Sequence, residues 1–182
     1  MRPGIVHRLD GGTSGLMMVA RDPKTMGRLQ RMFTYREIDK QYIALAHGRP
    51  KKSEAIISGP IDHDPDDYYH QAIVAGGKPS LTGYKVLWTR NDVSLVNFKL
   101  YTGRTHQIRL QCASHGYPLI GDTAYGAERL TGAGQDFFLH AYELHFPENS
   151  CALPPIIRAP IMTFFEKMLS KTLIKWDGRL IV

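Results

Sequence analysis

Short apolar runs and alternating side chains along the chain predict strands. In residues 40–48, Tyr42 and Ala44 alternate with Ile43, as expected of a strand with two distinct faces. Residues 16–20 are all apolar and predict a strand buried on both faces. The predicted strands comprise residues 5–9, 16–20, 40–48, 84–89, 93–102 and 139–146.

Helices are predicted where apolar residues recur every three or four positions. Asp22 and Pro23 are typical of a helix start, because aspartate caps free backbone N–H groups and proline fits the first turn. Beyond this start, Met26, Leu29 and Phe33 share one helical face. Two further helices are predicted at residues 105–115 and 163–173.

The order of these elements indicates the fold class. Residues 84–89 and 93–102 are consecutive strands joined by a short turn, as in a hairpin. Residues 49–79 are polar and turn-rich, so no regular element is predicted there. Because strands and helices do not alternate regularly, we predict an α+β fold with a mixed, mostly antiparallel sheet and flanking helices.

The composition is typical of a globular protein of the cytoplasm. The 182 residues are 43% hydrophobic and 22% charged, which supplies enough apolar material for a core. No apolar run is long enough to cross a bilayer, and the N-terminus has no apolar signal region. Cys112 and Cys151 lack metal-binding and redox spacing and are predicted to be reduced thiols.

The net charge of +6 is concentrated in the first third of the chain. Residues 1–60 hold eleven Lys and Arg against five Asp and Glu, whereas the remainder is balanced. A basic zone on a balanced chain is typical of a surface that binds a polyanion. The alternative is a solvated basic helix face that includes Lys24, Arg28 and Arg31, and charge alone leaves both interpretations open.

Spacing excludes several common motifs. Residues 76–79 lack the first glycine and the Ser or Thr of a phosphate-binding loop. The aspartates of residues 62–67 alternate like calcium ligands, but Asp67 replaces the turn glycine and Ile73 the closing glutamate. The eight histidines are scattered without zinc-type spacing, so no metal site is predicted.

Two segments, residues 7–16 and 103–110, are dense in polar side chains within apolar surroundings. Asp10 lies in a loop rich in Gly, Ser and Thr, where a lone aspartate is usually a turn former. Loops are also where catalytic residues concentrate. From these residues alone, a catalytic and a turn-forming role for Asp10 both stay open.

The same segments resemble the motifs of one enzyme family. Residues 7–16 match the His-Arg-Leu-Asp-x-x-Thr-Ser-Gly-Leu signature of RluA/RluD-type RNA pseudouridine synthases, and residues 103–110 match their Gly-Arg-Thr-His-Gln-Ile-Arg motif. Residues 40–42 are similar to the family's second motif. Weaker matches at residues 121–126 and 139–141 follow in the expected order, so the resemblance covers nearly the whole chain.

The resemblance implies a pseudouridine synthase fold with a central catalytic cleft. Asp10 aligns with the catalytic aspartate that starts the isomerisation of uridine to pseudouridine. Tyr42 aligns with the tyrosine that stacks on the target uracil and can take its C5 proton, and Arg109 with the arginine that pairs with the aspartate. Arg8 aligns with an arginine that fills the gap left by the flipped base. Further substrate contacts are predicted from Thr13, Arg104, His106 and Gln107.

The resemblance also implies partners. Structured RNA, either rRNA or tRNA, is the expected substrate, and the chemistry requires neither a cofactor nor a metal. Action as a monomer in the cytoplasm, without membrane contact, is expected. Relatives usually begin earlier and often carry an S4-type RNA-binding domain, so residues 1–182 are expected to be a catalytic domain shortened at its N-terminus, without that S4 domain. The alternative is a catalytically weak RNA-binding fragment of such an enzyme.

Replacing Arg28 and Arg31 by alanine is expected to weaken RNA binding and to flatten its salt dependence, because fewer counterions are released. Both side chains lie off the apolar face of the predicted helix, so the fold is expected to persist. A salt titration of RNA binding measures the slope. An unchanged slope would exclude this helix from the RNA-binding surface.

Overall fold

The strand β2 (Asp39–His47) forms the centre of the structure, because both of its faces are buried. Tyr42 and Ala44 belong to the hydrophobic cluster on one face, whereas Ile43 and Leu45 belong to the cluster on the other. The alternating side chains of β2 therefore contribute to two hydrophobic clusters, one on each face of the sheet. The computed structural model describes residues 4–67, 69–129, 136–148 and 153–171.

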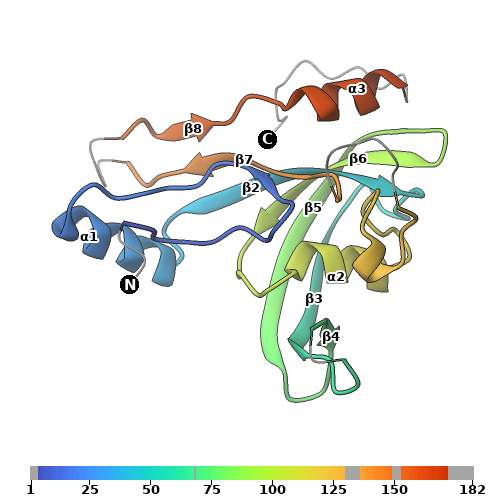
Figure 1. The fold of residues 1–182 in the computed structure, drawn as a ribbon, viewed down its shortest axis with the longest axis horizontal. Helices are drawn as coiled ribbons and strands as arrows, with labels where there is room; N and C mark the ends of the chain where they lie inside the picture. Colours follow the sequence, from blue (N-terminus) through green and yellow to red (C-terminus); the bar gives the residue numbers. More distant parts are fainter. Residues whose placement is uncertain (1–3, 68, 130–135, 149–152, 172–182) are drawn as a thin grey trace.

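Among the described residues, seven further strands join β2 in one sheet: β1 (Ser14–Gly15), β3 (Glu54–His63), β4 (Gln71–Ile73), β5 (Lys78–Arg90), β6 (Val93–Leu100), β7 (Leu139–His145) and β8 (Ile156–Arg158). Their order is β1-β7-β2-β6-β5-β3-β4, and β8 also pairs with β7 (Figure 1). Only the pairing of β1 with β7 is parallel within this described sheet. The predicted α+β fold with a mostly antiparallel sheet is confirmed.

Helices cover both faces of the sheet (Figure 1). They are α1 (Pro23–Thr34), α2 (Gln107–Ser114) and α3 (Thr163–Lys171), with a short 3-10 helix, η1 (Thr123–Tyr125). Ile108 of α2 packs with Tyr42 on one face, and Phe165 of α3 packs with Ile43 on the other. Leu29 of α1 lies in a third cluster beside β7. None of the described helices is long and apolar enough to cross a membrane.

Several local predictions are confirmed. The helix predicted to start at Asp22 is α1, and the Asp22 carboxylate accepts the backbone N–H of Thr25 at 2.8 Å. The predicted hairpin is formed by β5 and β6, whose tight turn holds Asn91 and Asp92 at φ 48° and 60°. The other two predicted helices are α2 and α3, except that residues 172–173 lie outside the described part of the chain.

Two strands predicted near the start of the chain are wrong. Residues 5–9 and 16–20 share only an isolated bridge between Ile5 and Val19. Residues 16–20 are not buried on both faces, because Val19 is 56% exposed whereas Met18 packs in the cluster of α1. The segment lies at the margin of the sheet, where one side of the chain faces solvent.

The prediction of turns throughout residues 49–79 is also wrong, because β3 and β4 lie there. The Gly-Pro pair within β3 is typical of turns. In the sheet, however, Pro60 lies directly opposite Pro79 of β5. Neither proline has an N–H to donate, so the two share a position where no backbone hydrogen bonds are exchanged.

A short parallel pairing holds the loop of residues 10–13 against the sheet. Ser14 of β1 pairs with His140 of β7, and Gly15 pairs with Ala141. Gly15 has φ +106°, and a Cβ there would lie 2.2 Å from the carbonyl oxygen of Ala141, so glycine is required. Ser14 Oγ also lies 2.8 Å from His140 Nδ1, within hydrogen-bond distance.

Burial lowers the pKa of His140 from 6.5 to about 4. As the pH falls from 6.5 towards 4, the unfolded chain takes up a proton that the folded protein resists, so this group costs up to about 3 kcal/mol of stability. His140→Asn keeps an acceptor for Ser14 and is expected to remove this component. Urea unfolding of both proteins at neutral and acidic pH measures it, and parallel pH profiles would contradict it.

Candidate active site

A cavity of about 670 Å³ is lined by β2, the loop before β1 and the loop before α2. It brings together the two polar segments that lie far apart in the sequence. Of the predicted site residues, His106 and Arg109 are not among those that line it. The predicted site residues that do line it are Arg8, Asp10, Thr13, Tyr42, Arg104 and Gln107.

Asp10 begins a tight turn within this cavity. Its carbonyl oxygen accepts the N–H of Thr13 at 3.0 Å, and Gly12 has φ +87° at the third position, which suits a type II turn. The backbone of Asp10 therefore forms the turn that its loop composition predicts. Its carboxylate makes no hydrogen bond and no ion pair among the described residues, so it stays available for chemistry.

Tyr42 reaches the same cavity from β2 and is 8% exposed. Burial raises the pKa of its phenol, and the negative charge of Asp10 raises it further. The Asp10 charge and the Tyr42 phenol are therefore close enough to interact electrostatically, and the raised pKa keeps the phenol protonated. A neutral phenol offers a flat apolar face with an O–H at its edge.

Arg109 has a different partner from the one that the resemblance predicts. Its Nε and Nη2 donate to the two carboxylate oxygens of Asp122 at 2.7 and 2.8 Å. Both side chains are buried. No ion pair joins Arg109 to Asp10 among the described residues, because the planar guanidinium fork is matched by Asp122 instead.

Arg109 nevertheless acts on Asp10 through space. Burial by itself lowers the pKa of Arg109, but the hydrogen bonds and charge of Asp122, together with the charge of Asp10, outweigh it and raise the pKa. The guanidinium also lies 5.1 Å from the ring centroid of Tyr125 and 4.2 Å from that of Phe137. Arg109 is therefore a fixed, buried cation near Asp10 rather than its hydrogen-bond partner.

Gln107 lines the cavity, but its side-chain amide is fully used within the protein. Its Oε1 accepts from the Thr102 hydroxyl and from the backbone N–H of Arg104 at 2.8 and 2.9 Å. Its Nε2 donates to the carbonyl of Leu81 and the hydroxyl of Thr82 at 3.1 and 2.7 Å. These four bonds satisfy the amide, so Gln107 positions the loop of Arg104.

Three other predicted residues keep polar atoms available for a ligand. Arg8 is exposed at the cavity. Thr13 Oγ1 is buried without a hydrogen-bond partner among the described residues, which is costly unless a ligand supplies one. Arg104 donates its Nε to the carbonyl of Pro79 at 3.1 Å and uses none of its terminal nitrogens within the described chain.

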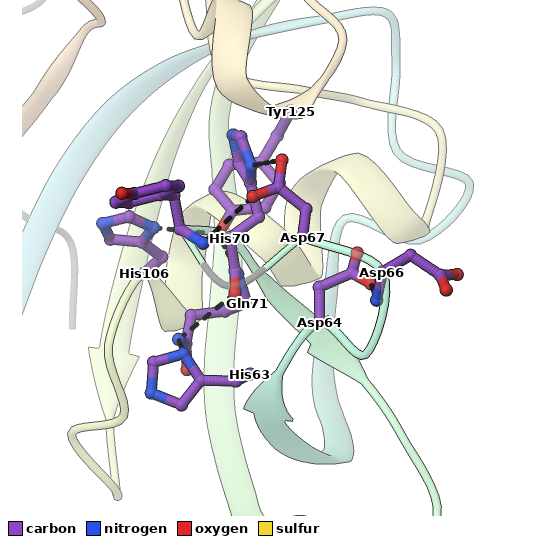
Figure 2. A network of polar contacts seen from close by, with 9 residues as sticks. His63, Asp64, Asp66, Asp67, His70, Gln71, His106 and Tyr125 are labelled. Atoms are coloured by element: carbon purple, nitrogen blue, oxygen red, sulfur yellow. Dashed lines mark hydrogen bonds and ion pairs between the residues drawn. The ribbon is translucent and has the colours of Figure 1, made fainter.

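His106 belongs to a polar network that extends to the β3–β4 loop (Figure 2). Its Nδ1 lies 2.8 Å from the hydroxyl of Tyr125, and that hydroxyl also accepts the backbone N–H of Gln71 at 3.2 Å. Burial and the charge of Arg109 lower the pKa of His106, while the charge of Asp10 opposes them. Through Tyr125, His106 therefore connects the β3–β4 loop to the surroundings of Asp10.

The aspartates between β3 and β4 bind the backbone of their own loop (Figure 2). Asp64 accepts the N–H of Asp66 at 2.9 Å, and Asp67 accepts the N–H of Tyr69 at 3.0 Å. Asp67 also lies 2.7 Å from Nδ1 of His70. Within the described ranges, no group of three or more His, Cys, Asp or Glu is arranged to hold a metal ion.

Four residues of this region have no role predicted from the sequence. Asp122 and Tyr125 lie in the weak match at residues 121–126, which did not indicate that Asp122 pairs with Arg109. Lys40, within the second motif, and Arg36 both line the cavity. No periodicity or motif indicated Arg36.

Comparison with known proteins identifies the class to which this fold belongs. The family description RNA pseudouridylate synthase matches residues 1–114. The chain belongs to the RNA pseudouridylate synthase family, as its motifs predicted.

Relatives support this assignment. The chain is 45% identical over 141 residues to an uncharacterized RNA pseudouridine synthase of Chloroflexus aurantiacus, covering 78% of this chain and 44% of that protein. It is 41% identical over 125 residues to ribosomal large subunit pseudouridine synthase D of Nitrosomonas europaea, covering 69% and 36%. The chain thus spans less than half the length of these relatives. Human RNA pseudouridylate synthase domain containing 1 is similar in structure, with a TM-score of 0.71 and 27% identity, over 94% of this chain and 80% of the human one.

Arg109→Lys is expected to lower the free energy of unfolding by about 1–3 kcal/mol, because lysine keeps the charge but cannot form the bidentate pair with Asp122. Asp122→Asn is expected to have a similar cost. The double variant should lose less than the sum of the two, since both changes break one pair. Denaturant unfolding of the four proteins measures this coupling, and strictly additive losses would contradict it.

Proposed function

We propose that this chain isomerises uridine to pseudouridine in RNA, with Asp10 as the nucleophile. The observation that carries the proposal is a carboxylate without a partner among the described residues, in a cavity shared with Tyr42 and Arg8. The charges of Arg109 and Asp10 interact, while the guanidinium donates its hydrogen bonds to Asp122 and leaves the Asp10 carboxylate uncovered. Membership of the family supports the reaction class.

The proposed reaction rearranges bonds within one nucleotide. The N1–C1′ glycosidic bond breaks, the uracil turns, and C5 bonds to C1′. The proton that leaves C5 is balanced by the one that N1 gains, so neither a cofactor nor a metal is required by the stoichiometry. The Asp10 oxygen acts in the first step, by attack on the ring, by attack on the sugar, or by promoting elimination to a glycal.

Tyr42 is proposed to hold the extruded base, and Arg8 to fill the gap that the base leaves in the RNA. A target uridine in folded RNA is stacked or paired, so it must leave the helix to reach a cavity of this kind. The ring of Tyr42 offers a stacking face for the uracil, and its raised pKa keeps the hydroxyl as a hydrogen-bond donor. Arg8, which is exposed at the cavity, is proposed to fill the space that the base vacates.

The substrate is proposed to be rRNA or tRNA, modified by a monomer in the cytoplasm. The name of the Nitrosomonas europaea relative, a ribosomal large subunit pseudouridine synthase, supports rRNA as the first substrate to test. A catalytically weak RNA-binding fragment is the alternative. The available Asp10 carboxylate favours the enzyme over that alternative, because a binding surface for phosphates gains nothing from it.

Asp10→Asn is expected to abolish pseudouridine formation, because it removes the charge and the nucleophilic oxygen while preserving size. RNA binding is expected to persist, since one carboxylate contributes nothing favourable to phosphate contact. Tritium release from 5-tritiated uridine in rRNA and tRNA transcripts measures turnover, and a filter-binding assay measures affinity.

The turn at residues 10–13 supplies the control for this test. Asparagine is also a good turn former, so Asp10→Asn is expected to keep the wild-type fold, as measured by thermal unfolding. Near-normal turnover in this variant would refute the catalytic assignment. Absence of turnover in wild type on every transcript, with RNA binding retained, would favour the RNA-binding alternative.

A further inference from the structure

Lys40 is a partly buried cation for which the described chain supplies no anion. It extends from β2 two residues before Tyr42, and both side chains line the cavity. Its ammonium makes no hydrogen bond and no ion pair among the described residues. Burial lowers the pKa of Lys40, and the nearby charge of Arg36 lowers it further. A buried charge without a partner is costly, so its presence indicates a ligand.

Arg36 provides a second, independent observation. It follows the C-terminus of α1 with φ +60°, the left-handed conformation in which glycine is the usual residue. An arginine is strained there, and strain of this kind is retained where a side chain is needed for function. The side chain of Arg36 lines the cavity and is close enough to Lys40 for its charge to lower the pKa of Lys40.

The other charged groups at this end of the cavity do not neutralise this pair of cations. Asp39 lines the cavity, but its carboxylate lies 2.6 Å from the ammonium of Lys99. His7 is held as an acceptor, since its Nε2 accepts the backbone N–H of Met18 at 2.9 Å. Burial lowers the pKa of His7, and Lys40 lowers it further, which favours the neutral ring; a histidine supplies no negative charge in either protonation state.

We propose that Lys40 and Arg36 bind a phosphate group of the nucleotide whose uracil stacks on Tyr42. The identity of this nucleotide rests on the proposed function. Residues two apart on a strand project on the same side about 7 Å apart, which matches the reach from a base to the phosphate of its own nucleotide. The cavity then has a reactive end at Asp10 and a phosphate-binding end at Lys40 and Arg36.

Three variants test this assignment. Lys40→Met removes the charge and keeps the length of the side chain. Arg36→Gly removes the charge and also relieves the left-handed strain, so the protein is expected to be at least as stable as wild type while binding phosphate less well. Arg90→Met is the charge-matched control, because the β2–β6 and β5–β6 registers place Arg90 at the opposite end of the strands from Lys40.

The probes are uridine, uridine 3′-monophosphate and uridine 5′-monophosphate, with affinities measured by NMR titration. Wild type and Arg90→Met are expected to bind one monophosphate about tenfold more tightly than uridine, as charge-assisted hydrogen bonds provide. The monophosphate that gains affinity identifies which phosphate is bound. Lys40→Met is expected to lose this advantage and keep its affinity for uridine, and Arg36→Gly to lose part of it.

Equal affinity of wild type for uridine and both monophosphates, including no detectable binding of any of them, would overturn the proposal. So would an unreduced phosphate advantage in Lys40→Met, or a thermal destabilisation of Arg36→Gly without a change in binding. Failure of the proposed function is seen separately as absent tritium release from wild type. A phosphate advantage that depends on Lys40 in an inactive wild type would support the phosphate site alone.

Discussion

The close approach of Gly15 to β7 is the contact on which the site depends. A side chain at this position would meet the carbonyl oxygen of Ala141 at 2.2 Å, so only glycine lets the chain pair there in parallel. This pairing fixes the end of the turn that Asp10 begins. β7 in turn pairs with β2, which carries Tyr42. The sheet therefore holds the motif of Asp10 and the motif of Tyr42 in fixed positions relative to each other.

Charges around the cavity are arranged so that the Asp10 carboxylate has no partner among the described residues. Arg109 is buried and interacts electrostatically with Asp10, yet its Nε and Nη2 both donate to the carboxylate of Asp122. A direct ion pair would lower the nucleophilicity of the Asp10 oxygens and block access to them. Because Asp122 holds the guanidinium, the charge of Arg109 acts on the cavity without a direct contact to the Asp10 oxygens.

Local sequence patterns predicted the elements that neighbouring residues specify. They failed for an element whose formation depends on pairing with a distant strand. The cap at Asp22 and the alternation through Tyr42 follow from neighbouring residues, so α1 and β2 were predictable. β3 was missed because the Gly-Pro pair suggests a turn, and only the pairing with β5 shows that Pro60 lies at a position where no backbone N–H is needed. In the site, motif resemblance placed Asp10 in the cavity, but no pattern in one sequence showed that Asp122 occupies Arg109.

The cations in this region fall into two groups, those with a carboxylate partner in the protein and those without one. The first group stabilises the fold, and we propose that the second binds substrate. Arg109 and Lys99 each have a carboxylate at hydrogen-bond distance, so their charges are balanced within the fold. Lys40 and Arg36 have none among the described residues, although burying Lys40 unpaired and holding Arg36 at φ +60° both cost stability. A fold retains such costs where a bound anion offsets them. Lys40 and Arg36 belong to the basic excess of residues 1–60, whereas Arg109 and Lys99 lie in the balanced remainder, which agrees with the proposal that the excess charge serves to bind phosphate.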